Sequence, residues 1–156
     1  MTRTLTPLLA ALLLATAPVA HAETVAKKKV AAPVTAPAAA DEIKVVYHIN
    51  DASVARAAMN NVNNELNASP GDKIVVVAHG KGIDFLLNDA KDDKGPFEPQ
   101  VADLKAKGVD FRVCNNTLQS RKLGPDAVIM EAKVVPSGVA EITRLQAKEG
   151  YVYVKP

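Results

Sequence analysis

Five short apolar runs that alternate with helix-like segments constrain the fold of this chain more than any other feature. The runs cover residues 43–49, 73–78, 109–113, 132–135 and 151–154. The first two are dense in Val and Ile and lack the strict polar alternation of a strand with one solvated face. Such strands are typical of parallel sheets that are buried on both sides. The order of runs and helices therefore predicts an α/β domain with a mainly parallel sheet, covered by helices on both faces.

The segments between the runs have the apolar spacing and the end signals of helices. From Ala55 the apolar residues recur at helix spacing as far as Leu66, and the turn at Pro70 and Gly71 ends this helix. Shorter helices are expected over residues 83–87, 98–107, 117–123 and 137–149. The charged stretch 88–96 is expected to be a loop.

The N-terminal part of the chain has the composition of an export signal followed by a tether. Arg3 precedes an apolar stretch from Leu5 to Val19, and Ala20-His21-Ala22 fits the small-residue cleavage pattern of a signal peptide. We therefore expect a signal peptide over 1–22, a disordered Ala/Pro/Lys linker over 23–41 and an α/β domain over 42–156. This organisation predicts a periplasmic protein with no integral membrane domain after cleavage, and the alternative is an uncleaved membrane anchor.

The composition argues against several classes of function. The 19 Lys and Arg residues nearly balance the 17 Asp and Glu residues, and the chain has no Trp, so nucleic acid is not an expected partner. No Gly-x-Ser-x-Gly motif, paired-carboxylate pattern or P-loop is present. No cofactor is expected.

Chemistry-bearing residues stand at the carboxyl ends of the expected strands. His48 and Asn50 close the first run, His79 follows the second, and Cys114 follows the third. In an open parallel sheet, ligands bind just outside the carboxyl ends of the strands. The sequence therefore predicts that the cysteine and the two histidines meet at one edge of the sheet, with His48 and Asn50 as binding residues.

Cys114 is the only cysteine of the chain, so it cannot form an internal disulfide. Asn115, Asn116 and Thr117 follow it, and such helix-capping residues place it beside the positive end of a helix, where a thiolate is favoured. The alternatives are a buried inert thiol, an intermolecular bridge, and a metal ligand together with the two histidines. No His or Cys spacing typical of a metal site is present, so no metal ligand is assigned.

His79 precedes a Gly-Lys-Gly turn in which the backbone could approach a ligand. Gly80 and Lys81 are therefore expected to bind a ligand, although the turn lacks the glycine spacing of a phosphate-binding loop. His48 lies within a strand pattern, and its alternative role is that of a hydrogen-bonded core histidine.

The residues that carry these signals resemble the DsrE/DsrF-like family, in particular its small exported single-domain branch. The similarity covers the strand that ends in His48 and Asn50, the Val-Val-Val-Ala-His79-Gly80 segment and the Arg-Val-Cys114-Asn115-Asn-Thr117 segment. The resemblance implies a three-layer α/β/α fold with a mainly parallel five-stranded sheet. It also implies a homo-oligomer, either a trimer or a hexamer built from trimers.

In the sulfur-relay branch of this family a cysteine carries sulfur as a persulfide, and Cys114 is the only residue here that matches that role. The resemblance thus implies a periplasmic carrier or handler of sulfur with a sulfur-donor or sulfur-acceptor protein as partner. His79 would stabilise the thiolate, and Asn115, Asn116 and the helix end would bind the anionic sulfur. The alternatives are a non-catalytic oligomeric module that binds a small anion or a protein, and a His/Cys metal-binding protein.

Overall fold

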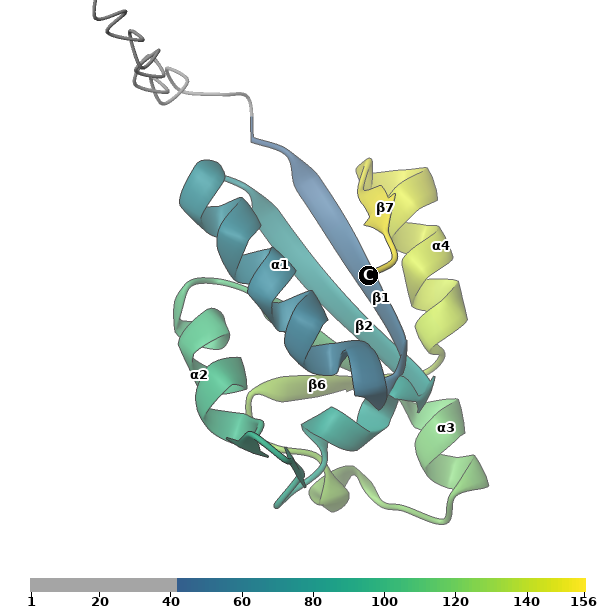
Figure 1. The fold of residues 1–156 in the computed structure, drawn as a ribbon. Helices are drawn as coiled ribbons and strands as arrows, with labels where there is room; N and C mark the ends of the chain where they lie inside the picture. The colour runs from purple at the N-terminus through teal and green to yellow at the C-terminus, as the bar shows by residue number, and fades with distance from the viewer. Residues whose placement is uncertain (1–41) are drawn as a thin grey trace, which may run out of the picture. The chain divides into compact units, whose positions relative to one another are not determined.

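The computed structural model describes residues 42–156, so the expected signal peptide and linker lie outside the described residues. A five-stranded sheet forms the centre of the domain, in the order β6-β5-β2-β1-β7, and every neighbouring pair is parallel (Figure 1). Its strands are β1 (Lys44–Asp51), β2 (Lys73–Lys81), β5 (Asp110–Cys114), β6 (Ala132–Val135) and β7 (Val152–Val154). The predicted α/β class with a parallel five-stranded sheet is confirmed.

Helices cover both faces of this sheet and so form three layers. Helices α1 (Ala55–Ala68) and α2 (Glu98–Ala106) lie on one face, and α4 (Gly138–Glu149) lies on the other (Figure 1). The short helix α3 (Asn115–Ser120) follows directly after β5 at the carboxyl end of the sheet. None of the helices in residues 42–156 has the length and apolarity needed to cross a membrane.

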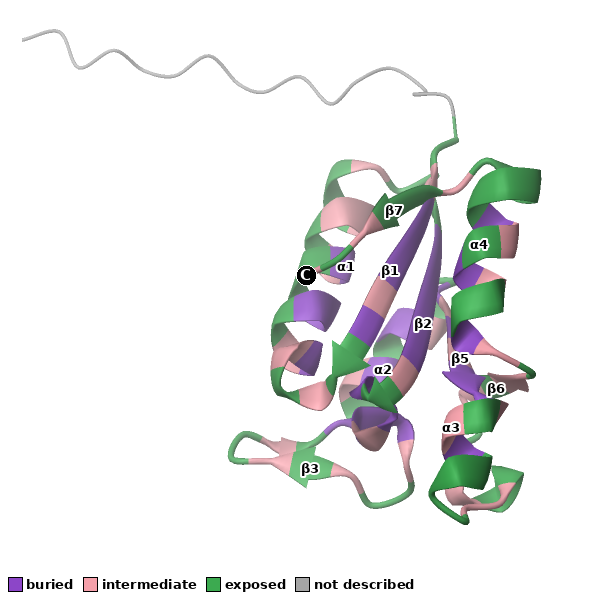
Figure 2. Cartoon of the chain, turned by 90° about the vertical axis from the view of Figure 1, so that its right-hand side faces the viewer, coloured by how far each residue is buried: buried purple, intermediate pink, exposed green. Residues whose placement is uncertain are grey.

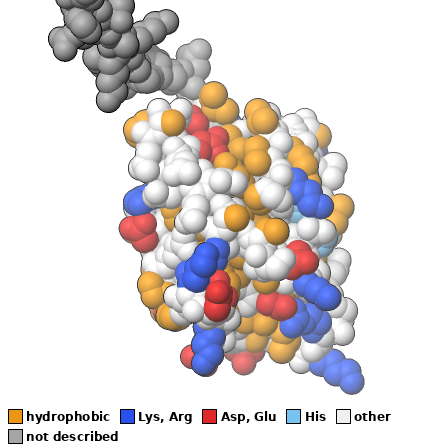
Figure 3. Space-filling model, viewed as in Figure 1, with side chains coloured by type: hydrophobic (Ala, Val, Ile, Leu, Met, Phe, Trp, Pro, Cys, Tyr) orange, Lys and Arg blue, Asp and Glu red, His pale blue; other side chains and the backbone are white. Residues whose placement is uncertain are grey.

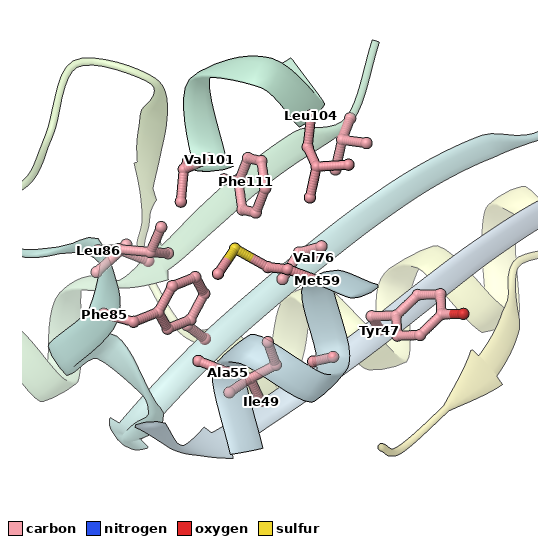
Figure 4. Packing of buried hydrophobic residues seen from close by; sticks show 14 of the residues in the cluster. Tyr47, Ile49, Ala55, Met59, Val76, Phe85, Leu86, Val101, Leu104 and Phe111 are labelled. Carbon is pink, nitrogen blue, oxygen red and sulfur yellow. The ribbon is translucent and has the colours of Figure 1, made fainter. Parts of the chain in front are cut away.

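The larger core fills the space between the sheet and the α1/α2 layer. Met59 from α1 packs among Phe85, Phe111 and Val76, while the ring of Tyr47 lies at the end of the cluster (Figure 4). These side chains are at most 5% exposed, and each buried side chain of this size contributes about 1.5–3 kcal/mol relative to its exposed state. The apolar residues from Ala55 to Leu66 recur at helix spacing, so they lie on one side of α1, and that side packs against the sheet.

A smaller core holds α4 on the opposite face. Ile142 and Leu145 of the helix pack against Val46 of β1 and against Val75 and Val77 of β2. Because side chains alternate along a strand, residues two positions beyond Val46 and Val77 point to this same face. Those residues are the two histidines.

A polar network adds to the attachment of α4. Arg112 of β5 donates hydrogen bonds to Asp110 on its own strand and to Glu141 on α4. Arg144, one turn further along α4, donates to the same Glu141 carboxylate. The side chains of Arg112 and Glu141 are only 15% and 13% exposed, so this ion pair is largely removed from water.

Several elements differ from the sequence-based expectation, and three of these differences lie at the carboxyl edge of the sheet. Strand β2 continues three residues past Ala78, because Lys81 pairs with Asp51 at the end of β1. Helix α3 begins at Asn115 instead of Thr117, because Cys114 itself occupies the N-cap position. The helix expected over 83–87 is a 3-10 helix, Gly82–Leu86.

The charged stretch 88–96 contains a small antiparallel hairpin that the sequence did not predict. Its strands are β3 (Lys91–Asp92) and β4 (Gly95–Pro96), each only two residues long. The guanidinium of Arg56 on α1 binds both Asp92 oxygens at 2.9 Å and also binds the carbonyl of Gly95. A cation from a distant helix therefore stabilises the hairpin, and no local pattern reveals such a contact.

Candidate functional site

The carboxyl ends of the central strands are where the sheet reaches the surface. Strands β1 and β2 are buried along most of their length and become partly exposed at these ends (Figure 2). His48 and His79 are each half-buried there, and histidine atoms are visible at the surface of the domain beside basic side chains (Figure 3). The expected meeting place of the chemistry-bearing residues is therefore accessible to water.

The two histidines are in direct contact. Their Nε2 atoms lie 2.6 Å apart, and the rings stack with centroids 4.6 Å apart. On its other side, His48 Nδ1 lies 2.6 Å from the hydroxyl of Tyr153 on β7. The side chains of Tyr153, His48 and His79 thus form one hydrogen-bonded row across β7, β1 and β2.

Both imidazoles are held in the neutral form. Burial lowers the pKa of His48, and its histidine neighbour and Lys155 lower it further. Burial also lowers the pKa of His79, again with a contribution from the positive charge of Lys155. A neutral ring can accept a proton at one nitrogen and donate one at the other, so these residues suit proton transfer at neutral pH.

Cys114 lies beside His79 on the same face of the sheet. Strands β2 and β5 pair in register as far as Ala78 and Val113, and His79 and Cys114 are the next residues of the two strands. A Cβ atom placed on Gly138, the first residue of α4, would lie 3.1 Å from the Cβ atoms of both residues. The start of α4 therefore packs closely on the two residues, and a side chain at position 138 would require its neighbours to shift by a few tenths of an ångström.

Hydrogen-bonding groups next to Cys114 lower the pKa of its thiol. Burial raises this pKa, but the nearby backbone N–H groups of Gly138, Thr117 and Asn116 and the hydroxyl of Thr117 bring it below its ordinary value. The Gly138 N–H belongs to the first turn of α4, whose dipole favours negative charge at this point. The residue itself is 5% exposed. The arrangement stabilises a thiolate that is shielded from bulk water.

Thr117 connects this sulfur to a neighbouring pocket. The hydroxyl of Thr117 accepts a hydrogen bond of 3.0 Å from the N–H of Gly80. The pocket has a volume of about 680 Å³ and opens to solvent. Its lining residues come from the end of β2, the following 3-10 helix and α3: Gly80, Lys81, Asp84, Thr117, Ser120 and Arg121.

The backbone conformation and close packing of the turn favour glycine at positions 80 and 82. Gly80 has φ +57°, a conformation that glycine adopts without strain. A Cβ atom on Gly82 would lie 2.1 Å from the carbonyl oxygen of Ile49, so any larger residue would clash with β1. The turn after β2 therefore packs closely against the end of β1. Lys81, between the two glycines, is exposed and lines the pocket.

The structure places the other predicted site residues at the same edge but in different settings. Asn115 and Asn116 form the first turn of α3, and the Asn116 backbone N–H donates to the carbonyl of Pro136 at 3.3 Å. Asn50 is exposed at the end of β1, and its carbonyl oxygen lies near Gly80. The sequence did not identify Tyr153 or Gly138 as site residues, because only the pairing of β7 with β1 and the packing of α4 on the sheet bring them to the site.

Metal binding receives no support from the side-chain positions. Within residues 42–156, no three His, Cys, Asp or Glu side chains are grouped closely enough to hold a metal ion.

Comparison with known proteins agrees with this fold. Residues 28–156 match the DsrE/DsrF-like family, and the chain belongs to this family. Its structure is similar to that of a protein of unknown function, MTH1491, from Methanobacterium thermoautotrophicum, with 32% sequence identity and a TM-score of 0.67. The match covers 74% of this chain and 100% of that protein. Among proteins of curated function, none matches this chain.

Proposed function

We propose that this protein accepts and carries sulfur on Cys114 as a persulfide. The observation that supports the proposal most strongly is the position of Cys114 at the N-cap of α3 and beneath the first residue of α4, where backbone N–H groups and the Thr117 hydroxyl lower the pKa of the thiol. A terminal persulfide sulfur is also an anion, and the same kind of environment would stabilise it. Membership of the DsrE/DsrF-like family supports a role in sulfur handling.

The transfer step balances without any cofactor. The Cys114 thiolate attacks the terminal sulfur of a donor persulfide, and a new S–S bond forms at Cys114. The S–S bond of the donor breaks, and the donor thiolate leaves with the electron pair. His79 is neutral and lies next to Cys114 on the same face of the sheet, and in this proposal it accepts the proton that the thiol loses. The reverse reaction would deliver the sulfur to an acceptor thiol.

The pH dependence of thiol alkylation tests this proposal. The chain has one cysteine, so the rate of labelling reports on Cys114 alone, and Cys114→Ser supplies the blank. We expect the folded protein to react with a small alkylating reagent at a rate that follows a thiolate of lowered pKa. A thiol that reacts only after denaturation would overturn the proposal.

The second candidate function is a binding module without chemistry at Cys114. The low exposure of the thiol and the pocket that contains Lys81 and Arg121 favour it, since both cations could contact a small anion. Arg121 is paired with Asp84, so an anion would have to compete for that guanidinium. Calorimetry with inorganic phosphate separates the two functions. If the protein is a binding module, the wild type and Cys114→Ser should bind phosphate with equal affinity. Phosphate binding that is lost in Cys114→Ser would argue against a binding module.

We also propose that the protein works in the periplasm as a homo-oligomer, with a sulfur-donor or sulfur-acceptor protein as partner. The N-terminal sequence supports export, and membership of the DsrE/DsrF-like family supports a homo-oligomer. Cell fractionation tests the location. Light scattering of the mature chain tests the assembly, and a monomer would contradict the trimer or hexamer.

A further inference from the structure

Two hydrogen bonds that share one imidazole make up the row of Tyr153, His48 and His79. Its two contacts, Tyr153 Oη to His48 Nδ1 and His48 Nε2 to His79 Nε2, are both 2.6 Å long. They use both nitrogens of His48, so the imidazole bridges its two neighbours. A bridging imidazole can take up a proton at one nitrogen and release another from the opposite nitrogen.

Two arrangements of protons satisfy this row. In the first, His79 Nε2–H donates to His48 Nε2, and His48 Nδ1–H donates to the Tyr153 oxygen. In the second, the Tyr153 hydroxyl donates to His48 Nδ1, and His48 Nε2–H donates to His79 Nε2. Each arrangement leaves both rings and the phenol neutral. They differ at the ends: His79 Nδ1 is bare in the first arrangement and carries a proton in the second.

One end of the row reaches water, and the residue at the other end is the neighbour of Cys114 on the adjacent strand. Strand β7 is the edge strand of the sheet (Figure 2), and Tyr153 on it is 40% exposed. At the other end, His79 lies beside Cys114 beneath the first residue of α4, where the thiol itself is nearly inaccessible. A buried thiol needs a path by which its proton can leave, and the row provides one.

We propose that Tyr153, His48 and His79 form a proton relay that connects Cys114 with the solvent at strand β7. The relay rests on the proposed function of Cys114. When the thiol ionises, its proton passes to His79 Nδ1, the Nε2 proton of His79 passes to His48, and the Nδ1 proton of His48 passes to the Tyr153 oxygen. Tyr153 then releases its own proton to water. The row changes from the first arrangement to the second, and every group in it stays neutral.

The same row resets when sulfur transfer is complete. The donor thiolate that leaves takes the proton from His79 Nδ1, and a proton from water enters at Tyr153 and restores the first arrangement. The neutral state of the rings at neutral pH agrees with this cycle. Lys155, whose positive charge lowers the pKa of both rings, disfavours an imidazolium that would trap the proton.

Nuclear magnetic resonance of the imidazole nitrogens tests the row itself. We expect a scalar coupling between the two Nε2 atoms and signals that show one protonated and one unprotonated Nε2. Tyr153→Phe removes only the phenol oxygen and should shift the balance between the two arrangements. Tyr151→Phe, on the same C-terminal segment and outside the row, should leave the signals unchanged. Absence of the coupling, or equal spectra for wild type and Tyr153→Phe, would overturn the relay.

Kinetics test whether the row serves Cys114. Uptake of sulfur from a low-molecular-weight persulfide should be slower in D₂O than in H₂O for the wild type and for Tyr151→Phe. Tyr153→Phe should be slower by roughly tenfold or more and lose much of the solvent isotope effect, since proton transfer by a positioned group contributes at least that much. A wild-type rate and isotope effect in Tyr153→Phe would overturn the relay and leave the proposed function standing.

A wild-type protein that takes up no sulfur at all would overturn the proposed function. In that case the nitrogen coupling alone decides whether the hydrogen-bonded row exists. Tyr153→Phe is a conservative change at an exposed residue of an edge strand, so we expect the variant to fold.

Discussion

Thr117→Val is the sharpest single test of the environment that the fold builds around the Cys114 sulfur. The substitution keeps the shape of the side chain and removes the hydroxyl, which accepts the N–H of Gly80 at 3.0 Å and, as a hydrogen-bonding group beside the sulfur, lowers the pKa of Cys114. A hydrogen bond to a charged group contributes about 1.5–3 kcal/mol. We therefore expect the pKa of Cys114 to rise.

The assay is the ultraviolet absorbance of the thiolate as a function of pH, which reports on Cys114 alone because the chain has no other cysteine. Thr117→Ser retains the hydroxyl and serves as the matched control, with an expected pKa close to that of the wild type. The backbone N–H donors remain in both variants, so neither should reach the pKa of an unperturbed thiol. Equal pKa values for wild type and Thr117→Val would refute the role of the hydroxyl.

Three further perturbations have defined outcomes. Gly138→Ala puts a methyl group 3.1 Å from the Cβ atoms of His79 and Cys114, and we expect a loss of about 1–3 kcal/mol of unfolding free energy in urea titrations. An unchanged stability would mean that α4 does not press on the two side chains. Glu141→Gln leaves Arg112 with a weakened partner at a largely buried position, and a loss of about 1–3 kcal/mol is expected by thermal or chemical unfolding. Acidification should also destabilise the fold, because the pKa of both site histidines is lower in the folded than in the unfolded chain. Below the unfolded pKa of about 6.5 the unfolded chain binds more protons, so unfolding free energy should fall between about pH 7 and pH 5, and His79→Gln should reduce that fall.

Most of the fold could be predicted from the sequence, because the patterns that define its strands and helices are local. The Val- and Ile-rich runs of β1 and β2 exclude any solvated strand face, and the spacing of Ala55 through Leu66 defines the buried side of α1. The rule that ligands bind at the carboxyl ends of parallel strands was enough to predict that His48 and His79 lie at the same edge of the sheet. It could not show that their Nε2 atoms meet, since that depends on the register between β1 and β2.

The missing parts of the site depend on long-range packing. Tyr153 reaches His48 only because β7 adds to the edge of the sheet beside β1, and a three-residue strand carries no sign of its neighbour. Gly138 reads as part of a helix start, and its close approach to Cys114 follows from the way Ile142 and Leu145 seat α4 on the sheet. The groups that lower the pKa of the Cys114 thiol are mostly backbone N–H groups, which a sequence pattern does not identify.

Intact-mass spectrometry after incubation with a low-molecular-weight persulfide tests the role of Cys114 most directly. The wild-type chain should gain the mass of one sulfur atom, lose it again on reduction, and show no gain as Cys114→Ser. Folded wild-type protein that stays at its original mass under conditions in which a small free thiol becomes persulfidated would contradict sulfur carriage at this residue.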